Sequence, residues 1–152
     1  MADTPVGYFL TWTAYSTWLP GDERGWVDGA THEVQFEPAP QRERQARQLM
    51  VESPVALTQE QRSVVDHAIR DHCRIRRWEL HTVNVRVKHV HVVVSLPEGP
   101  KKALREFKAW ATRRLKERNP GRVNWWTEGG SKRWLWTDED LEQALIYVRD
   151  FQ

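Results

Sequence analysis

The chain has 152 residues, of which 39% are hydrophobic and 29% are charged. This balance fits one soluble domain with a sizeable core and excludes a disordered chain. No apolar run approaches the roughly 18 residues of a membrane-spanning helix, and residues 1–5 lack the pattern of a secretory signal. A single cysteine, Cys73, excludes an internal disulfide framework and a cysteine-based zinc site. We therefore expect a cytoplasmic protein.

Charge is distributed unevenly along the sequence. Residues 1–40 carry a net charge of −5 and residues 70–125 carry +10, although the whole chain carries only +2. Most of the 23 basic residues are arginines, which suit forked contacts to phosphate. A basic central segment favours a polyanionic partner, most simply nucleic acid, whereas the alternative is a solvated basic face on an ordinary protein.

Hydrophobic periodicity predicts an alternation of strands and helices. In chain order, we expect a strand at 7–14, a helix at 59–76, strands at 79–87 and 89–96, a helix at 101–118, a hairpin or loop between residues 125 and 136, and a last helix from 137 to about 149. This order predicts an α+β domain of the ferredoxin-like, split β-α-β type, with helices on one face of an antiparallel sheet. The other sheet face is left uncovered.

Capping motifs and one irregular segment define the boundaries of these elements. Thr58 and Gln61 form a capping box, and Thr137 is expected to cap the last helix. The segment at about 17–57 is too long and too rich in proline for an ordinary connection. We interpret it as an insertion, with a short helix at 41–52, in a single domain that spans residues 1–152.

His89 and His91 are the clearest local signal for chemistry. Residues two apart on a strand point the same way, so both imidazoles lie on one face and the intervening valine points to the other. If the valines face the helices, the histidines stand on the open face and make half of a divalent metal site. The alternative is that two strand histidines simply line a polar sheet face.

The predicted helix at 101–118 carries many cations with one tryptophan among them. Such surfaces suit single-stranded nucleic acid, because cations hold phosphates and indoles stack on bases. We expect one or two of the nine tryptophans to contact a ligand. The candidate DNA-binding residues are Lys101, Lys102, Arg105, Lys108, Arg113 and Arg114.

Tyr147 lies on the last helix and, taken alone, is most simply a buried aromatic. In combination, His89-Val90-His91, the segment at 107–111, and Tyr147 followed by Gln152 resemble the HUH single-tyrosine transposases. That family includes small insertion-sequence transposases and REP-associated tyrosine transposases. The resemblance extends over nearly the whole chain, from residue 7 through Tyr147.

The resemblance implies a metal-dependent endonuclease and strand transferase that acts on single-stranded, hairpin-containing DNA. His89, His91 and Gln152 would hold Mg²⁺ or Mn²⁺, and Tyr147 would attack the scissile phosphate to form a 5′-phosphotyrosine link. The covalent link conserves the bond energy, so no nucleotide cofactor is needed. We also expect a homodimer, no membrane contact and an association with the nucleoid.

Two departures from the family pattern concern the metal site. Lys88 stands where many relatives carry asparagine, and Gln152 follows Tyr147 by five residues instead of four. The extra residue rotates the side chain by about 100° around a helix, so Asp150 is an alternative third ligand.

Two other functions remain open from the sequence. A nucleotide hydrolase of the histidine-triad type would need a third histidine at position 93, but this chain carries Val93 there. The main rival is a non-catalytic ferredoxin-like DNA- or RNA-binding protein, such as a domesticated transposase relative that binds hairpins but cleaves poorly.

Overall fold

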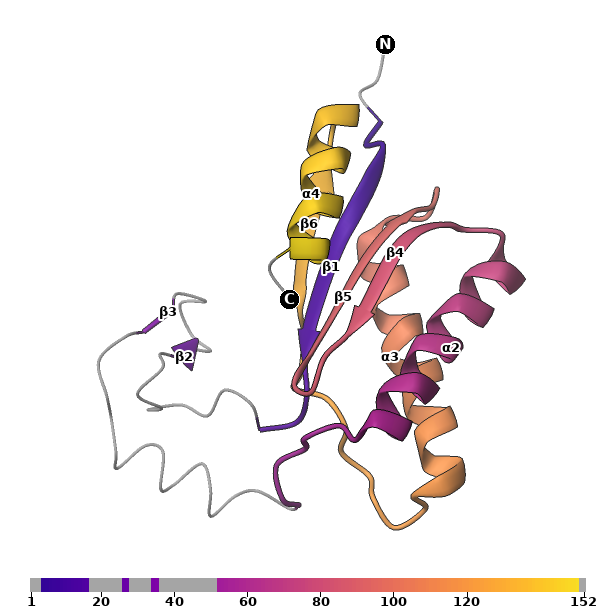
Figure 1. Cartoon of the computed structure of the whole chain (residues 1–152), viewed down its shortest axis with the longest axis vertical. Coiled ribbons are helices and arrows are strands. Elements are labelled where there is room, and N and C mark those ends of the chain that lie inside the picture. The colour runs from indigo at the N-terminus through magenta and orange to yellow at the C-terminus, as the bar shows by residue number, and fades with distance from the viewer. Residues whose placement is uncertain (1–3, 17–25, 28–33, 36–51, 151–152) are drawn as a thin grey trace.

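The computed structural model describes residues 4–16, 26–27, 34–35 and 52–150. Its centre is a four-stranded antiparallel sheet in the order β4-β5-β1-β6 (Figure 1). These strands are β1 Gly7–Thr13, β4 Glu79–Val85, β5 His89–Ser95 and β6 Ser131–Leu135. A separate antiparallel pair consists of β2 Trp26–Val27 and β3 Val34–Gln35. The order and directions of the four central strands confirm the predicted α+β, ferredoxin-like fold.

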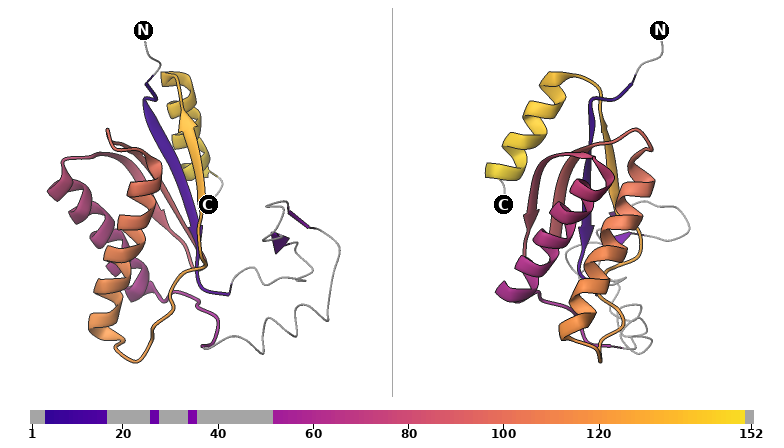
Figure 2. Two further views of the ribbon diagram at one scale, coloured as in Figure 1. Left: turned by 180° about the vertical axis from the view of Figure 1, so that it is seen from behind. Right: turned by 90° about the vertical axis from the view of Figure 1, so that its right-hand side faces the viewer.

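Two helices cover one face of the four-stranded sheet (Figure 2). They are α2, Gln59–Arg76, and α3, Pro100–Arg118, close to their predicted bounds. The capping box is confirmed, because the Gln61 backbone N–H donates to Thr58 Oγ1 over 3.1 Å and the Thr58 N–H donates to Gln61 Oε1 over 2.9 Å. These bonds satisfy N–H groups that the start of a helix leaves without partners.

The main core lies between this helix pair and the sheet. Trp12 of β1 is buried and stacks on Phe107 of α3, with ring centroids 6.3 Å apart. Val90, Val92 and Val94 of β5 are fully buried in the same core. Because side chains alternate along a strand, the residues between these valines point to the opposite face of the sheet.

The opposite face is partly covered by the last helix, α4, Asp138–Asp150 (Figure 2). The Asp140 N–H donates to Thr137 Oγ1 over 3.0 Å, which confirms Thr137 as the cap. Ala144 and Val148 of α4 are buried in a second, smaller core. The prediction that this face is uncovered was therefore wrong. Apolar residues recur along α4 at helical spacing, and they pack against the sheet.

Most of the predicted insertion lies outside the described residues, as does the expected helix at 41–52 except for its last residue. The end of the insertion is fixed to the domain: Val55 and Leu57 are buried, and their N–H groups donate to the carbonyls of Tyr15 and Val87. Residues 125–130 form a loop instead of a hairpin strand, because β6 pairs with β1. In the part of the chain that the structure describes, no helix has the length and apolar character needed to cross a membrane.

Candidate active site

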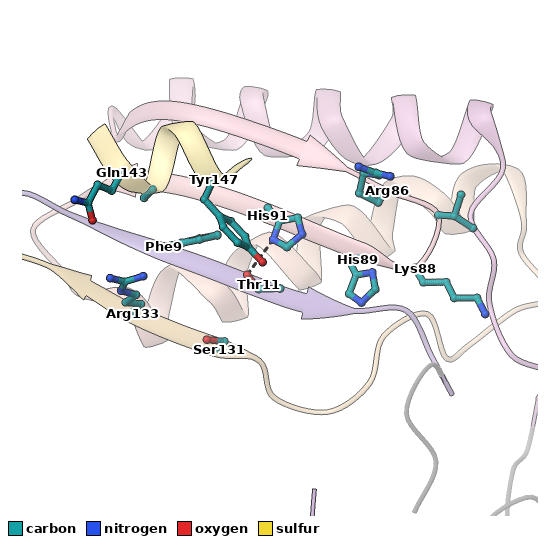
Figure 3. Close-up of a pocket in the computed structure, with 12 residues that line it drawn as sticks. Phe9, Thr11, Arg86, Lys88, His89, His91, Ser131, Arg133, Gln143 and Tyr147 are labelled. Carbon is teal, nitrogen blue, oxygen red and sulfur yellow. Dashed lines mark hydrogen bonds between the residues drawn. The ribbon is translucent and has the colours of Figure 1, made fainter. Parts of the chain in front are cut away.

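The two histidines of β5 lie side by side on the face that carries α4. Their rings are nearly parallel, at 11°, with centroids 6.2 Å apart (Figure 3). The intervening Val90 is buried under the helix pair on the other face. The prediction that His89 and His91 share one face, with the valines toward the helices, is therefore confirmed.

The imidazole of His91 is held by its neighbour in β1. Thr11 stands opposite His91 in the strand register, and its Oγ1 lies 3.1 Å from His91 Nδ1. Partial burial lowers the pKa of His91, and electrostatic repulsion from the neighbouring His89 and Arg86 adds to the effect. A neutral imidazole whose Nδ1–H donates to Thr11 keeps a lone pair on Nε2, which is the state that binds metals.

Tyr147 reaches from α4 toward the histidines, as Figure 3 shows. Its ring centroid lies 6.4 Å from that of His91, at an interplanar angle of 80°, and 5.8 Å from that of Phe9. Tyr147 is 47% exposed, so it is not the buried aromatic that the helix pattern alone favoured. The phenol stands at the edge of a small core and is half exposed to solvent.

These residues line one pocket of about 1120 Å³ over the α4 face of the sheet. Besides the histidines and Tyr147, the pocket is lined by three cationic residues: Arg86, Lys88 and Arg133. None of the described residues that line it is acidic. A pocket with two imidazoles, one phenol and three cations is suited to a phosphate backbone.

The sequence did not predict that these three cations line the pocket, although Lys88 stood out as a departure from the family pattern. Arg86 and Lys88 come from the turn between β4 and β5, on either side of Val87, and directly precede His89. Arg133 arrives from β6, where it stands opposite Phe9 of β1. The proximity of Arg86 and Lys88 to His89 in the sequence was an available signal, whereas Arg133 depends on a strand pairing that the sequence does not reveal.

Comparison with known proteins identifies the family. Residues 52–139 match the family model described as "Transposase IS200 like". The chain belongs to the IS200-like transposase family. The matched segment includes both histidines of this transposase and ends before Tyr147.

Two solved structures share the fold of this transposase. The structure of a REP-associated tyrosine transposase bound to a REP hairpin matches with a TM-score of 0.55 and 17% identity, over 97% of this chain and 67% of that one. The crystal structure of a Deinococcus radiodurans R1 protein assigned as a transposase matches with a TM-score of 0.56 and 13% identity, over 98% of this chain and 92% of that one. Among curated protein sequences, none matches significantly.

The donor set fits a divalent metal in part. His89 and His91 offer two imidazoles, but no group of three or more His, Cys, Asp or Glu side chains within the described residues is placed to hold an ion. Gln152 lies outside the described residues. Asp150 is exposed, accepts a hydrogen bond from Arg149 Nε over 2.8 Å that lowers its pKa, and does not line the pocket. Gln143 lines the pocket but lies at the opposite end from His89 (Figure 3).

The predicted DNA-binding residues of α3 lie on the other side of the sheet from this pocket. Three are exposed, Lys101, Arg105 and Arg113. Lys102 pairs with Glu98 over 3.5 Å, Arg114 lies 3.9 Å from Asp71, and the Arg113 guanidinium covers the Trp110 ring at 4.8 Å. A DNA contact by these residues stays a prediction, and the structure does not bring them together with the histidines.

Lys108 has a role within the fold that the sequence did not indicate. Its Nζ donates to the carbonyl oxygens of Thr127 and Gly129, each over 2.8 Å. Burial lowers its pKa. Lys108 therefore holds the loop that leads into β6, because its half-buried ammonium is bonded to the backbone of that loop.

Proposed function

We propose that this transposase-family protein is a single-strand DNA endonuclease and strand transferase with Tyr147 as the nucleophile. The observation that carries the proposal is the half-exposed Tyr147 ring beside His91 in a pocket with three cations. Three positive side chains around a phenol favour the binding of phosphodiester groups next to the hydroxyl. The REP hairpin bound by one structural neighbour supports hairpin-containing DNA as the substrate class.

The reaction proposed for this pocket is a transesterification. The Tyr147 oxygen forms a bond to phosphorus as it loses its proton, and the bond to the 3′ oxygen breaks, which leaves a 5′-phosphotyrosine and a free 3′-hydroxyl. Attack by another 3′-hydroxyl reverses the step and joins two DNA ends, so no nucleotide cofactor is consumed. Arg86, Lys88 and Arg133 hold the phosphates on either side of the reacting one.

A phenol with an ordinary pKa of about 10 is a weak nucleophile at neutral pH. A divalent cation, Mg²⁺ or Mn²⁺, held by His89 and His91 would polarise the phosphate and stabilise the charge that develops on it. Thr11 orients one of the two imidazoles for this task. Gln152 and Asp150 are the candidates for the third ligand. The same proposal includes a homodimer and an association with the nucleoid.

The second candidate function is DNA binding without cleavage. It is favoured by the lack of a third His, Cys, Asp or Glu ligand among the described residues. Both candidates predict binding of hairpin DNA, and only the first predicts a covalent product. Formation of a covalent protein–DNA product therefore distinguishes the two candidate functions.

The decisive assay incubates the protein with labelled hairpin DNA and Mn²⁺ and looks for a covalent adduct on a denaturing gel. We expect an adduct with the native protein and none with Tyr147→Phe, although that variant should still fold and bind DNA. Tyr15→Phe, outside the pocket, is the matched control and should form the adduct normally. A Tyr147→Phe protein that forms the adduct at the native rate would refute the assignment.

A further inference from the structure

The edge strand β6 connects the pocket with the opposite face of the sheet. It is the last strand in the order β4-β5-β1-β6, so one of its sides has no partner within this four-stranded sheet. Arg133 stands opposite Phe9 and lines the pocket, whereas Trp134 stands opposite Tyr8 and points to the face that carries α3. Neighbouring residues of this edge strand thus point to opposite faces of the sheet.

Trp134 is unusually exposed for a tryptophan of this fold. It is 43% exposed, and Trp136, directly after the strand, is 50% exposed, whereas Trp12, Trp78 and Trp125 are each buried to at least 94%. The rings of Trp134 and Tyr8 meet nearly at right angles, with centroids 6.0 Å apart. This contact fixes a large aromatic side chain at the molecular surface, where packing of the core does not require it.

Three cationic residues lie on the same face of the sheet as Trp134. Lys132 precedes it by two residues and points to the same face of β6. Lys101 and Arg105 are exposed on the stripe of α3 that also carries Lys108, whose ammonium holds the loop leading into β6. Residues at spacings of four and three share one side of a helix, so both cations lie on the side of α3 that faces β6.

We propose that Lys132, Trp134, Lys101 and Arg105, together named the β6 edge surface, bind single-stranded DNA that leaves the pocket across β6. The Trp134 indole stacks on an unpaired base, and the three cations contact phosphates. The acidic first turn of α4 comes soon after Trp136, and its negative charges repel a phosphate backbone there. Trp134 is therefore the principal stacking residue. This inference rests on the proposed function, because it extends the path of the same DNA strand.

The chemistry of the surface favours a single strand over other partners. An indole can stack on a base only where the base is not already stacked within a duplex. A second copy of the chain docked through the same surface would bring like charges together, which opposes association. A strand that passes from Arg133 to Trp134 instead meets positive charge on both faces of β6.

Binding of labelled oligo(dT) of two lengths, measured by fluorescence anisotropy, tests the inference. An oligomer of about 4 nucleotides can occupy the pocket alone, whereas one of about 20 can also reach the β6 edge surface. Trp134→Ala should weaken binding of the long oligomer about 5- to 30-fold and leave the short one unchanged. Trp134→Phe should retain most of the affinity, and Ile75→Ala, which removes an exposed side chain of α2, should have no effect.

Each other outcome overturns the inference in a recognisable way. If the native protein binds the long oligomer more tightly than the short one and Trp134→Ala binds both as the native protein does, the β6 edge surface is not used. If Trp134→Ala alters only the sedimentation coefficient, the surface joins protein copies. If the native protein forms the adduct with hairpin DNA but binds both oligomers with equal affinity, this inference fails and the proposed function stands. If it forms no adduct with hairpin DNA, the proposed function itself fails.

Discussion

Thr11→Val tests whether the hydrogen bond to His91 prepares that imidazole for a metal ion. The substitution replaces the hydroxyl that lies 3.1 Å from His91 Nδ1 with a methyl group of similar size. One partly buried hydrogen bond contributes about 1 kcal/mol, so the free energy of unfolding should fall by about that amount. Loss of the partner that orients a metal-binding histidine typically costs about 10- to 100-fold in metal affinity or activity.

The expected result is a rise of about tenfold or more in the Mn²⁺ concentration that gives half of the maximal adduct, with the adduct restored at saturating Mn²⁺. The assay is a Mn²⁺ titration of covalent adduct formation with hairpin DNA. Thr82→Val is the control: it makes the same substitution on β4, opposite Val93 and outside the pocket. An unchanged Mn²⁺ requirement in Thr11→Val would refute the role of the hydrogen bond.

Three further predictions concern the helix pair on the other face of the sheet. Burial raises the pKa of the Cys73 thiol from 9.0 to about 12, so the native protein should resist thiol reagents at pH 8, and rapid labelling of the native protein would contradict this. The free energy of unfolding should fall above about pH 9, where the thiol of the unfolded chain ionises. Glu106→Ala removes the 2.7 Å bond to buried His72 and should lower the free energy of unfolding in urea by about 2 kcal/mol, whereas an unchanged midpoint would count against it. Lys108→Met should lower the free energy of unfolding by about 1–2 kcal/mol, because it removes two bonds to backbone carbonyls. Arg113→Met should lower the affinity for DNA at nearly native stability. If Lys108→Met instead lowers the affinity for DNA and leaves stability unchanged, Lys108 contacts DNA.

Local periodicity was sufficient to predict the two histidines and their orientation. Alternation along one strand places His89 and His91 on the face opposite Val90, whatever the rest of the chain does. Capping chemistry likewise defined where α2 and α4 begin, because the Thr58 and Thr137 side chains bond to backbone groups three residues away. These features depend only on neighbouring residues.

Features that depend on long-range pairing were not accessible in the same way. Arg133 enters the pocket because β6 pairs with β1 in one particular register, and a shift of one residue would have turned it away. Lys108 looked like one of several surface cations on α3, and only the path of residues 127–129 gives its ammonium two carbonyl partners. The sequence likewise showed that α4 is amphipathic without showing which sheet face it covers.

The most direct test of the account is to identify the residue that becomes joined to DNA. The native protein is incubated with hairpin DNA and Mn²⁺, digested with a protease and a nuclease, and analysed by mass spectrometry. The account predicts a peptide that carries a nucleotide remnant on the Tyr147 oxygen, with the 5′-phosphate as the linking group. A remnant on Tyr8 or Tyr15, or bound and intact DNA with no covalent product, would contradict the claim that Tyr147 is the nucleophile.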